Sequence, residues 1–288
     1  MNTSLDCIPC IIRQALEAAR FMTTDASVHE QTIREVLTFT ATMDLNLSPP
    51  VAAQRIHRRL REILGEDDPY RDIKNRFNRM AKDLLPELSV QIKTSTDPLA
   101  TAVRLAIAGN VIDLGVNGNI TESQAHHAMM NTMSEPFWGD LDEFRRTISD
   151  AKDILYLGDN AGEIIFDALL LKHLKTMANK ITFAVRGGPI LNDATMPDAE
   201  FAGICDLVEV IDNGSDAPGT ILDDCSDSFQ KRFNEACLIL AKGQGNYETL
   251  SDVNANIFFL FKAKCPVIAS QVGQPVGTHV LLRSKQKT

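Results

Sequence analysis

The chain has 288 residues, of which 44% are hydrophobic and 23% are charged, a composition typical of a folded globular protein. Asp and Glu outnumber Lys and Arg by 38 to 29, and the net charge of −9 argues against nucleic acid or an anionic membrane as the main partner. Six cysteines without a signal-peptide pattern favour reduced thiols. We therefore expect a cytoplasmic protein with no membrane partner.

The first half of the chain shows the periodicity of helices. Ile11, Ala15 and Ala18 lie on one face of a first predicted helix, and later segments repeat the spacing of three and four residues between apolar positions. These later predicted helices cover 28–43, 50–64, 97–115 and 119–128. We therefore predict a helical bundle domain over residues 1–150.

After residue 150, short apolar runs alternate with helical segments. The runs do not alternate with polar residues, which is typical of parallel strands covered on both faces. The predicted strands are ILYL (154–157), ITFAV (181–185), LVEVI (207–211), CLILA (237–241) and PVIAS (266–270), with helices over 161–177 and 226–236. This pattern predicts a doubly wound α/β domain over residues 151–288.

Glycine and polar residues follow four of the predicted strands directly. These segments are GDNAGE (158–163), RGGPILND (186–193), DNGSD (212–216) and KGQGNYE (242–248). Ligands of open α/β sheets bind beyond the carboxyl ends of the strands, so four such segments predict a catalytic or binding edge. The alternative is structural, because Asp-Asn-Gly favours a turn and Asp159 is also suited to capping the helix that follows it.

The residue types at this edge indicate a particular chemistry. Asp159 and Asn160 offer oxygen ligands and Asp193 offers a third, a set that suits Mg²⁺ or Mn²⁺. The helix that opens after Asn160 favours an anion, and Arg186 and Lys242 add positive charge suited to phosphate. Together these features predict a site that handles phosphoryl groups.

Other motifs are absent or ambiguous. The chain contains no G-x-G-x-x-G, no P-loop and no G-x-S-x-G, which argues against a dinucleotide site, a P-loop enzyme and an α/β-hydrolase. The pair Cys7 and Cys10 has the C-x-x-C spacing of redox or zinc sites, but no second pair completes a zinc site. Structural thiols are the other interpretation of this pair.

The motifs in this order resemble the domain-of-unknown-function 89 family of metal-dependent damage-control phosphatases. The resemblance is strongest to its short prokaryotic branch, and it runs from Cys7 to about Ala269. The segments that carry it are GDNAGE (158–163), RGGPILND (186–193), KGQGNYE (242–248), FFLFKAKCPVIA (258–269), AGNVIDLG (108–115) and the N-terminal C-x-x-C. It implies a helical bundle packed on a Rossmann-like three-layer α/β/α domain with a mainly parallel sheet.

The resemblance also implies the roles of individual residues. It places a divalent metal ion, with Mg, Mn, Co and Ni as candidates, on Asp159, Asn160 and Asp193. The catalytic residues that it implies are Asp159, Asp193 and Lys242, the last of which would hold phosphate. The predicted substrate-binding residues are Arg186, Asn246, Asn110, Asp113 and Glu163. The C-terminal Arg-Thr-x-Lys motif of eukaryotic branches is absent here, so their substrates do not carry over.

We therefore predict a metal-dependent enzyme that hydrolyses phosphomonoesters of small metabolites, such as sugar phosphates or damaged phosphometabolites. Attack by water, with Asp193 or Asp113 as the base, and a route through an aspartyl-phosphate on Asp159 or Asp193 are both compatible with the residues. A carboxyl methyltransferase that uses S-adenosylmethionine is one alternative function. A non-catalytic metal or redox module built on Cys7 and Cys10 is the other, and the oligomeric state stays unknown.

Overall fold

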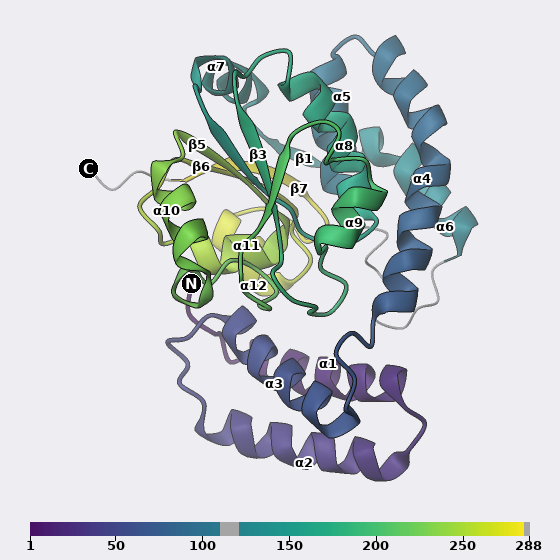
Figure 1. The fold of residues 1–288 in the computed structure, drawn as a ribbon, viewed down its shortest axis with the longest axis vertical. Coiled ribbons are helices and arrows are strands. Elements are labelled where there is room, and N and C mark those ends of the chain that lie inside the picture. Colours follow the sequence, from purple (N-terminus) through teal and green to yellow (C-terminus); the bar gives the residue numbers. More distant parts are fainter. Residues whose placement is uncertain (110–120, 285–288) are drawn as a thin grey trace.

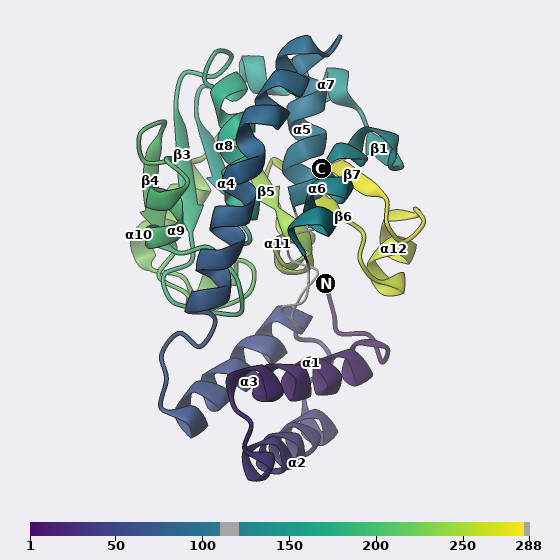
Figure 2. The same cartoon turned by 90° about the vertical axis from the view of Figure 1, so that its right-hand side faces the viewer.

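The computed structural model describes residues 1–109 and 121–284. Its first three helices form a lobe at the bottom of Figure 1, and the turned view in Figure 2 separates this lobe from the sheet. This three-helix lobe consists of α1 (Cys7–Met22), α2 (Ala26–Thr42) and α3 (Pro49–Leu64). Ile11, Ala15 and Ala18 are buried where α1 packs on the other two helices, which confirms the predicted apolar face.

Two helices that follow the lobe pack against the sheet domain instead. They are α4 (Arg71–Thr94) and α5 (Pro98–Ala108), followed by α6 (Glu122–Met130), a 3₁₀ turn (Thr132–Ser134) and α7 (Leu141–Asp150). Both α4 and α5 contact α8 (Glu163–Leu174), and α5 also contacts strands β6 (Ile257–Lys262) and β7 (His279–Arg283). Helices from before residue 150 thus pack on elements from after it, and the domain division at that residue stays a prediction.

The sheet has seven strands in the described residues, in the order β1-β7-β6-β5-β2-β3-β4. The strands are β1 (Phe137–Gly139), β2 (Ile154–Leu157), β3 (Ile181–Val185), β4 (Glu209–Asp212), β5 (Leu238–Lys242), β6 (Ile257–Lys262) and β7 (His279–Arg283). From β6 to β4 all neighbours are parallel, whereas β7 is antiparallel to β6. Leu157 pairs with Ala184 and Ala241, so β2, β3 and β5 end level at one edge.

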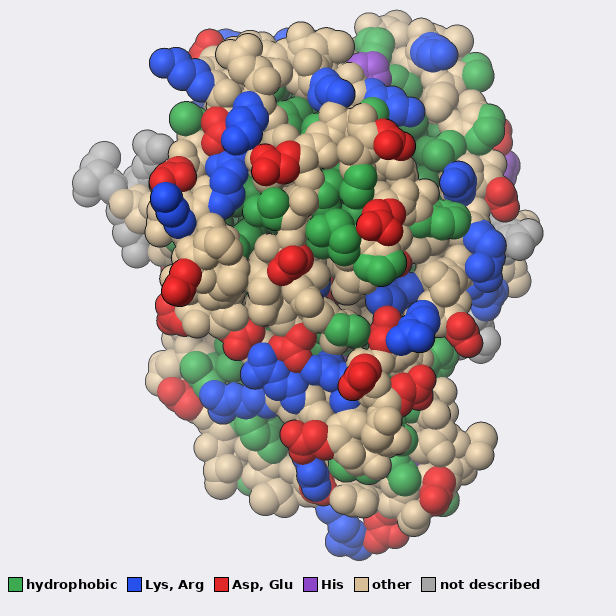
Figure 3. Space-filling view, in the orientation of Figure 1, with side chains coloured by type: hydrophobic (Ala, Val, Ile, Leu, Met, Phe, Trp, Pro, Cys, Tyr) green, Lys and Arg blue, Asp and Glu red, His purple; other side chains and the backbone are tan. Residues whose placement is uncertain are grey.

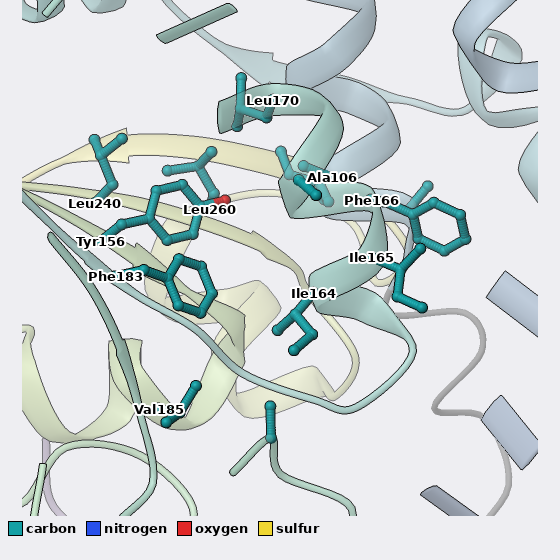
Figure 4. Close-up of a cluster of buried hydrophobic side chains, with 14 of the residues drawn as sticks. Ala106, Tyr156, Ile164, Ile165, Phe166, Leu170, Phe183, Val185, Leu240 and Leu260 are labelled. Carbon is teal, nitrogen blue, oxygen red and sulfur yellow. The ribbon is translucent and has the colours of Figure 1, made fainter. Parts of the chain in front are cut away.

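Helices cover both faces of this sheet because successive strand residues point to opposite sides. On one face, Tyr156 stacks on Phe183 with ring centroids 5.1 Å apart, beneath α8 (Figure 4). On the other face, Leu155 and Leu157 pack in a second buried cluster with residues of three further helices. These helices are α10 (Asp227–Glu235), α11 (Gly243–Leu250) and α12 (Pro266–Val272). The predicted three-layer α/β/α fold with a mainly parallel sheet is confirmed.

The predicted strand at 266–270 is wrong, because these residues form helix α12. Pro266 occupies the start of that helix, where its fixed φ and missing N–H are tolerated, whereas a central strand would lose a ladder hydrogen bond there. The strand lies earlier, in the apolar run of β6. The predicted helix over 97–115 is described only to Ala108, which ends α5. Within residues 1–109 and 121–284, no helix is long and apolar enough to span a bilayer.

Candidate active site

The loops after β2 and β3 lie side by side at the carboxyl edge of the sheet. Asn160 and Asp193 form an isolated antiparallel bridge between them. The Ala194 N–H donates to the Asp159 carbonyl oxygen, and the Ala161 N–H donates to the Asn192 carbonyl oxygen, both at 2.8 Å. Asp159, Asn160 and Asp193 are buried, so the structure brings the three predicted metal ligands together in a solvent-poor place.

Arg186, the first residue after β3, faces both carboxylates. Its Nε donates to Asp193 Oδ2 at 2.7 Å, and its Nη2 lies 3.5 Å from Asp159 Oδ1. The side chain is almost fully buried. Nη2 makes no hydrogen bond with the described residues, so part of the guanidinium is available to a further acceptor.

Lys242, the last residue of β5, lies beneath these loops with no exposed surface. Its ammonium donates to the carbonyl oxygen of Ala106 at 2.8 Å, to Glu163 Oε1 at 2.6 Å and to Asp167 Oδ1 at 2.7 Å. We call Lys242, Glu163 and Asp167 the buried ion cluster. All three ammonium hydrogens have protein acceptors, so a phosphate could be bound by Lys242 only in exchange for one of these bonds.

Burial and mutual repulsion disturb the carboxyl groups of this region. Burial, together with Glu163 and Asp193, holds the pKa of Asp159 well above its usual value. Burial also raises the pKa of Asp167, and Lys242 only partly offsets that effect. Burial alone would lower the pKa of Lys242, but Asp167 and Glu163 outweigh it and raise that pKa. Burial and the neighbouring carboxylates therefore disfavour the ionised form of Asp159, and a cation bound beside it would favour that form.

Two residues of the KGQGNYE segment fit closely around the ligand loops. Gly243 has φ +79°, and a Cβ on it would lie 1.9 Å from Asp159 Oδ2, so only glycine fits beside that carboxylate. Asn246 donates from Nδ2 to the carbonyl oxygens of Lys242 at 2.7 Å and Gly158 at 3.3 Å. Asn246 thus joins the ends of β5 and β2, and it has no exposed surface.

The residues at this edge fit a divalent cation in donor type and in charge. Asp159 and Asp193 contribute carboxylates and Asn160 contributes a carboxamide, the oxygen donors that Mg²⁺ and Mn²⁺ prefer. The buried charged side chains of the region are the carboxylates of Asp159, Glu163, Asp167 and Asp193 and the cations Lys242 and Arg186. A divalent cation would balance that excess. Within the described ranges, no three His, Cys, Asp or Glu side chains are arranged to hold a metal without such an amide.

A second set of charges joins the three-helix lobe to the loops of this edge. We call Arg58, Arg61, Asp216 and Asp224 the interlobe ion cluster. Arg58 Nη2 lies 2.5 Å from Asp216 Oδ1, Arg61 also pairs with Asp216, and Arg61 Nη1 donates to the Pro189 carbonyl oxygen at 2.7 Å. Figure 3 shows Lys and Arg beside Asp and Glu side chains at the level of α3. The lobe therefore holds the loop that carries Arg186 and Asp193.

The thiols predicted as a possible redox or metal pair lie on α1. Cys7 is the first residue of the helix, and the Cys10 sulfur accepts from Arg13 at 3.8 Å. Burial raises the pKa of Cys7, which disfavours the reactive thiolate. Asn110 and Asp113, predicted to bind substrate, lie outside the described residues.

The sequence did not indicate two residues that contact the site, Asp167 and Asn78. Asp167 follows Glu163 by one helical turn in α8, whose other central residues are apolar, and a lone carboxylate in such a helix signals a buried partner. Asn78 of α4 accepts a hydrogen bond from the Gly162 N–H at 2.7 Å. No local pattern marks Asn78, because its partners lie far along the chain.

Comparison with known proteins assigns the chain to a family. A model of the damage-control phosphatase ARMT1-like domain matches residues 3–280. The chain belongs to the damage-control phosphatase ARMT1-like domain family. It is similar to a damage-control phosphatase of Archaeoglobus fulgidus, with 38% identity over 97% of this chain and 98% of that protein. It is also similar to a damage-control phosphatase of Pyrococcus horikoshii, with 34% identity over the full length of both.

A solved structure supports the same assignment. The crystal structure of a domain-of-unknown-function 89 protein from Pyrococcus horikoshii matches with a TM-score of 0.89 and 32% identity, over 99% of this chain and 100% of that one. The predicted family and phosphatase function are confirmed, and the methyltransferase alternative is not favoured. Membership of this damage-control phosphatase family also indicates a metal-dependent enzyme, without identifying the metal.

Proposed function

We propose that this damage-control phosphatase hydrolyses phosphomonoesters of small metabolites, including sugar phosphates, with a divalent cation on Asp159, Asn160 and Asp193. The observation that carries the proposal is the convergence of two carboxylate-bearing loops around the Arg186 guanidinium in a buried, negatively charged place. The net charge of −9 supports a small substrate over nucleic acid, and we propose the cytoplasm as its location.

A bound divalent cation supplies Lewis-acid polarisation of a phosphate oxygen and lowers the pKa of a water molecule. Asp159 and Asp193 would hold it through carboxylate oxygens. Asn160 now donates from Nδ2 to Asp159 at 3.0 Å and to Glu163 at 3.3 Å. Rotation of that carboxamide by half a turn would present its oxygen to the cation instead.

Arg186 is the proposed phosphate-binding group of the chain. Its Nε is fixed by Asp193, and its Nη2 has no hydrogen-bond partner in the described part of the chain, so a phosphate oxygen can accept from it. A guanidinium held in this way neutralises charge on the transferring phosphoryl group without moving during the reaction.

Lys242 and Asn246 are proposed to support the site from beneath. Lys242 fixes Glu163, whose second carboxylate oxygen meets the Asn160 amide, and Asn246 joins the strand ends on which Asp159 and Lys242 stand. Direct contact of Lys242, Asn246 or Glu163 with phosphate stays a prediction. Water is the proposed nucleophile: its single in-line attack inverts a chiral phosphorus, whereas an aspartyl-phosphate route inverts it twice and so retains the configuration.

The test is hydrolysis of p-nitrophenyl phosphate by metal-stripped protein that is supplied separately with Mg²⁺, Mn²⁺, Co²⁺ or Ni²⁺. We expect Asp159→Asn to lower metal-dependent kcat by at least about 100-fold. The substitution removes an anionic ligand of the metal ion, and the phosphoryl group is then no longer held in position for attack. Asp153→Asn is the matched control: Asp153 immediately precedes β2 and pairs with Arg232 at the opposite edge. Full metal-dependent activity in Asp159→Asn would overturn the site.

A further inference from the structure

Asn78 of α4 is hydrogen-bonded to the loop that carries Asp159 and Asn160 and to Asp198 of the helix that follows the Asp193 loop. Its Oδ1 accepts from the Gly162 N–H at 2.7 Å, and its Nδ2 donates to Asp198 Oδ1 at 2.8 Å. Gly162 stands two residues after Asn160 in the first loop. With only 1% of its surface exposed, Asn78 makes these bonds away from competing water.

Asp198 carries the connection into the second loop. Its Oδ2 accepts from the Thr195 N–H and from the Thr195 hydroxyl, both at 2.9 Å, in the cap of helix α9 (Met196–Phe201). Thr195 stands two residues after Asp193. Lys74, one helical turn before Asn78, lies 3.7 Å from Asp198 and offsets part of its charge. The bonds thus run from the Asp159 loop through Asn78 and Asp198 to the Asp193 loop.

We propose that Asn78 is a positioning residue of the metal site, which sets the spacing between the Asp159–Asn160 loop and the Asp193 loop. The inference rests on the proposed function. A carboxamide is the side chain that the geometry requires, because one end must accept from a backbone N–H while the other donates to a carboxylate. Groups that orient metal ligands in this way typically contribute roughly 10–100-fold to metal affinity.

A purely structural role for Asn78 makes a different prediction. Helix α4 packs against α8 and α9, and in a purely structural role the same bonds only fasten α4 to those helices. In that case the loss of Asn78 lowers the unfolding temperature and leaves the affinity for metal unchanged. Metal affinity and thermal stability must therefore be measured on the same variants.

The experiment titrates Mn²⁺ alone into metal-stripped protein by isothermal titration calorimetry and records unfolding temperature without metal. We expect Asn78→Ala to weaken Mn²⁺ binding at least about tenfold. Asn78→Asp should weaken it more, because a carboxylate would then face Asp198 at 2.8 Å. Asn256→Ala is the matched control, since Asn256 fastens the chain just before β6, at the opposite edge of the sheet. It should bind Mn²⁺ as the wild type does.

The exchange variant Asn78→Asp with Asp198→Asn is the decisive arm, because it keeps every hydrogen bond and reverses donor and acceptor only between positions 78 and 198. The carboxylate at 78 accepts from Gly162, and the amide at 198 donates to it while accepting from Thr195. We expect affinity within about threefold of the wild type. Wild-type affinity in Asn78→Ala, or no rescue by a folded exchange variant, would overturn the role of Asn78. Absence of Mn²⁺ binding in the wild type would overturn the metal site itself.

Discussion

Two clusters of oppositely charged side chains adjoin the proposed active site and differ in their exposure to water. In the buried ion cluster, the side chains of Lys242, Glu163 and Asp167 are at most 1% exposed. In the interlobe ion cluster, the side chain of Arg58 is 45% exposed and that of Asp216 is 16% exposed. Both clusters have short N–O distances, so distance alone does not rank them.

The pKa values of one carboxyl group from each cluster shift in opposite directions. Burial raises the pKa of Asp167 to about 6 in spite of Lys242. Burial also acts on Asp216, but hydrogen bonds from Arg58, Gln54 and Arg61 outweigh it and hold its pKa below the usual value. Desolvation thus dominates at Asp167 and pairing dominates at Asp216, so the exposure of an ion pair to water must be known before its contribution to stability is judged.

The largest expected effect is the loss of Lys242. Lys242→Met leaves Glu163 and Asp167 buried without their cation, and we expect the free energy of unfolding to fall by about 3–5 kcal/mol. Urea unfolding followed by circular dichroism measures it. Lys172→Met, on the exposed side of the same helix α8 that carries the two carboxylates, is the control and should change little. If Lys242→Met lowers the free energy of unfolding by less than about 1 kcal/mol, the buried ion cluster does not depend on its cation as proposed.

An intermediate effect is expected in the pH dependence of stability. The folded state binds a proton at Asp167 more tightly than the unfolded state, whose aspartate pKa is about 3.9, so this group's contribution falls as pH rises from about 4 to 6. For Asp216 the folded pKa is lower, so its contribution is present above about pH 4 and is lost below it.

The variants Asp167→Asn and Asp216→Asn separate these two windows. Unfolding in urea at pH 3 to 8 should show wild-type stability falling relative to Asp167→Asn as pH rises through 4 to 6. Relative to Asp216→Asn, wild-type stability should rise with pH only up to about 4 and stay level above it. Parallel profiles for the two variants would contradict the distinction between the clusters.

The smallest effect is expected at the exposed end of the interlobe ion cluster. Arg58→Ala should cost less than about 1 kcal/mol, because its guanidinium is half in water. In 1 M NaCl, where the screening length is about 3 Å, that cost should shrink, whereas the cost of Lys242→Met should not. Urea unfolding at low and high salt measures both. If the loss of stability in Arg58→Ala is the same at low and high salt, packing of the side chain and not its charge holds the lobe there.

Much of the fold follows from local patterns. The ranges 154–157 and 181–185 were predicted as strands and are β2 and β3, because unbroken apolar runs end there in glycine or arginine. Asp159, Asn160, Asp193 and Arg186 could be grouped in advance, because adjacent parallel strands bring their carboxyl ends to one edge. The prediction of a strand at 266–270 was wrong, because the apolar residues of this run suit a buried helix as well as a strand.

What could not be predicted depends on contacts between distant residues. The saturation of the Lys242 ammonium requires Ala106, which lies 136 residues away, and Asp167, which lies 75 residues away. Helical periodicity locates the apolar face of a helix but not which polar side chain on that face meets a loop. The three-helix lobe shows the same limit, because its attachment to the Pro189 loop through Arg61 leaves no local trace.

The bond from Asn78 to Asp198 spans 120 residues, and this has a consequence for synthesis. A ribosome that adds about 5–20 residues per second needs roughly 6–24 s to reach Asp198 after Asn78 has been made. During that time the nascent helix α4 lacks the partners of its buried face. Newly made chains should therefore expose this segment to chaperones until Asp198 has been made, and the bond that connects the two ligand loops can form only after that point.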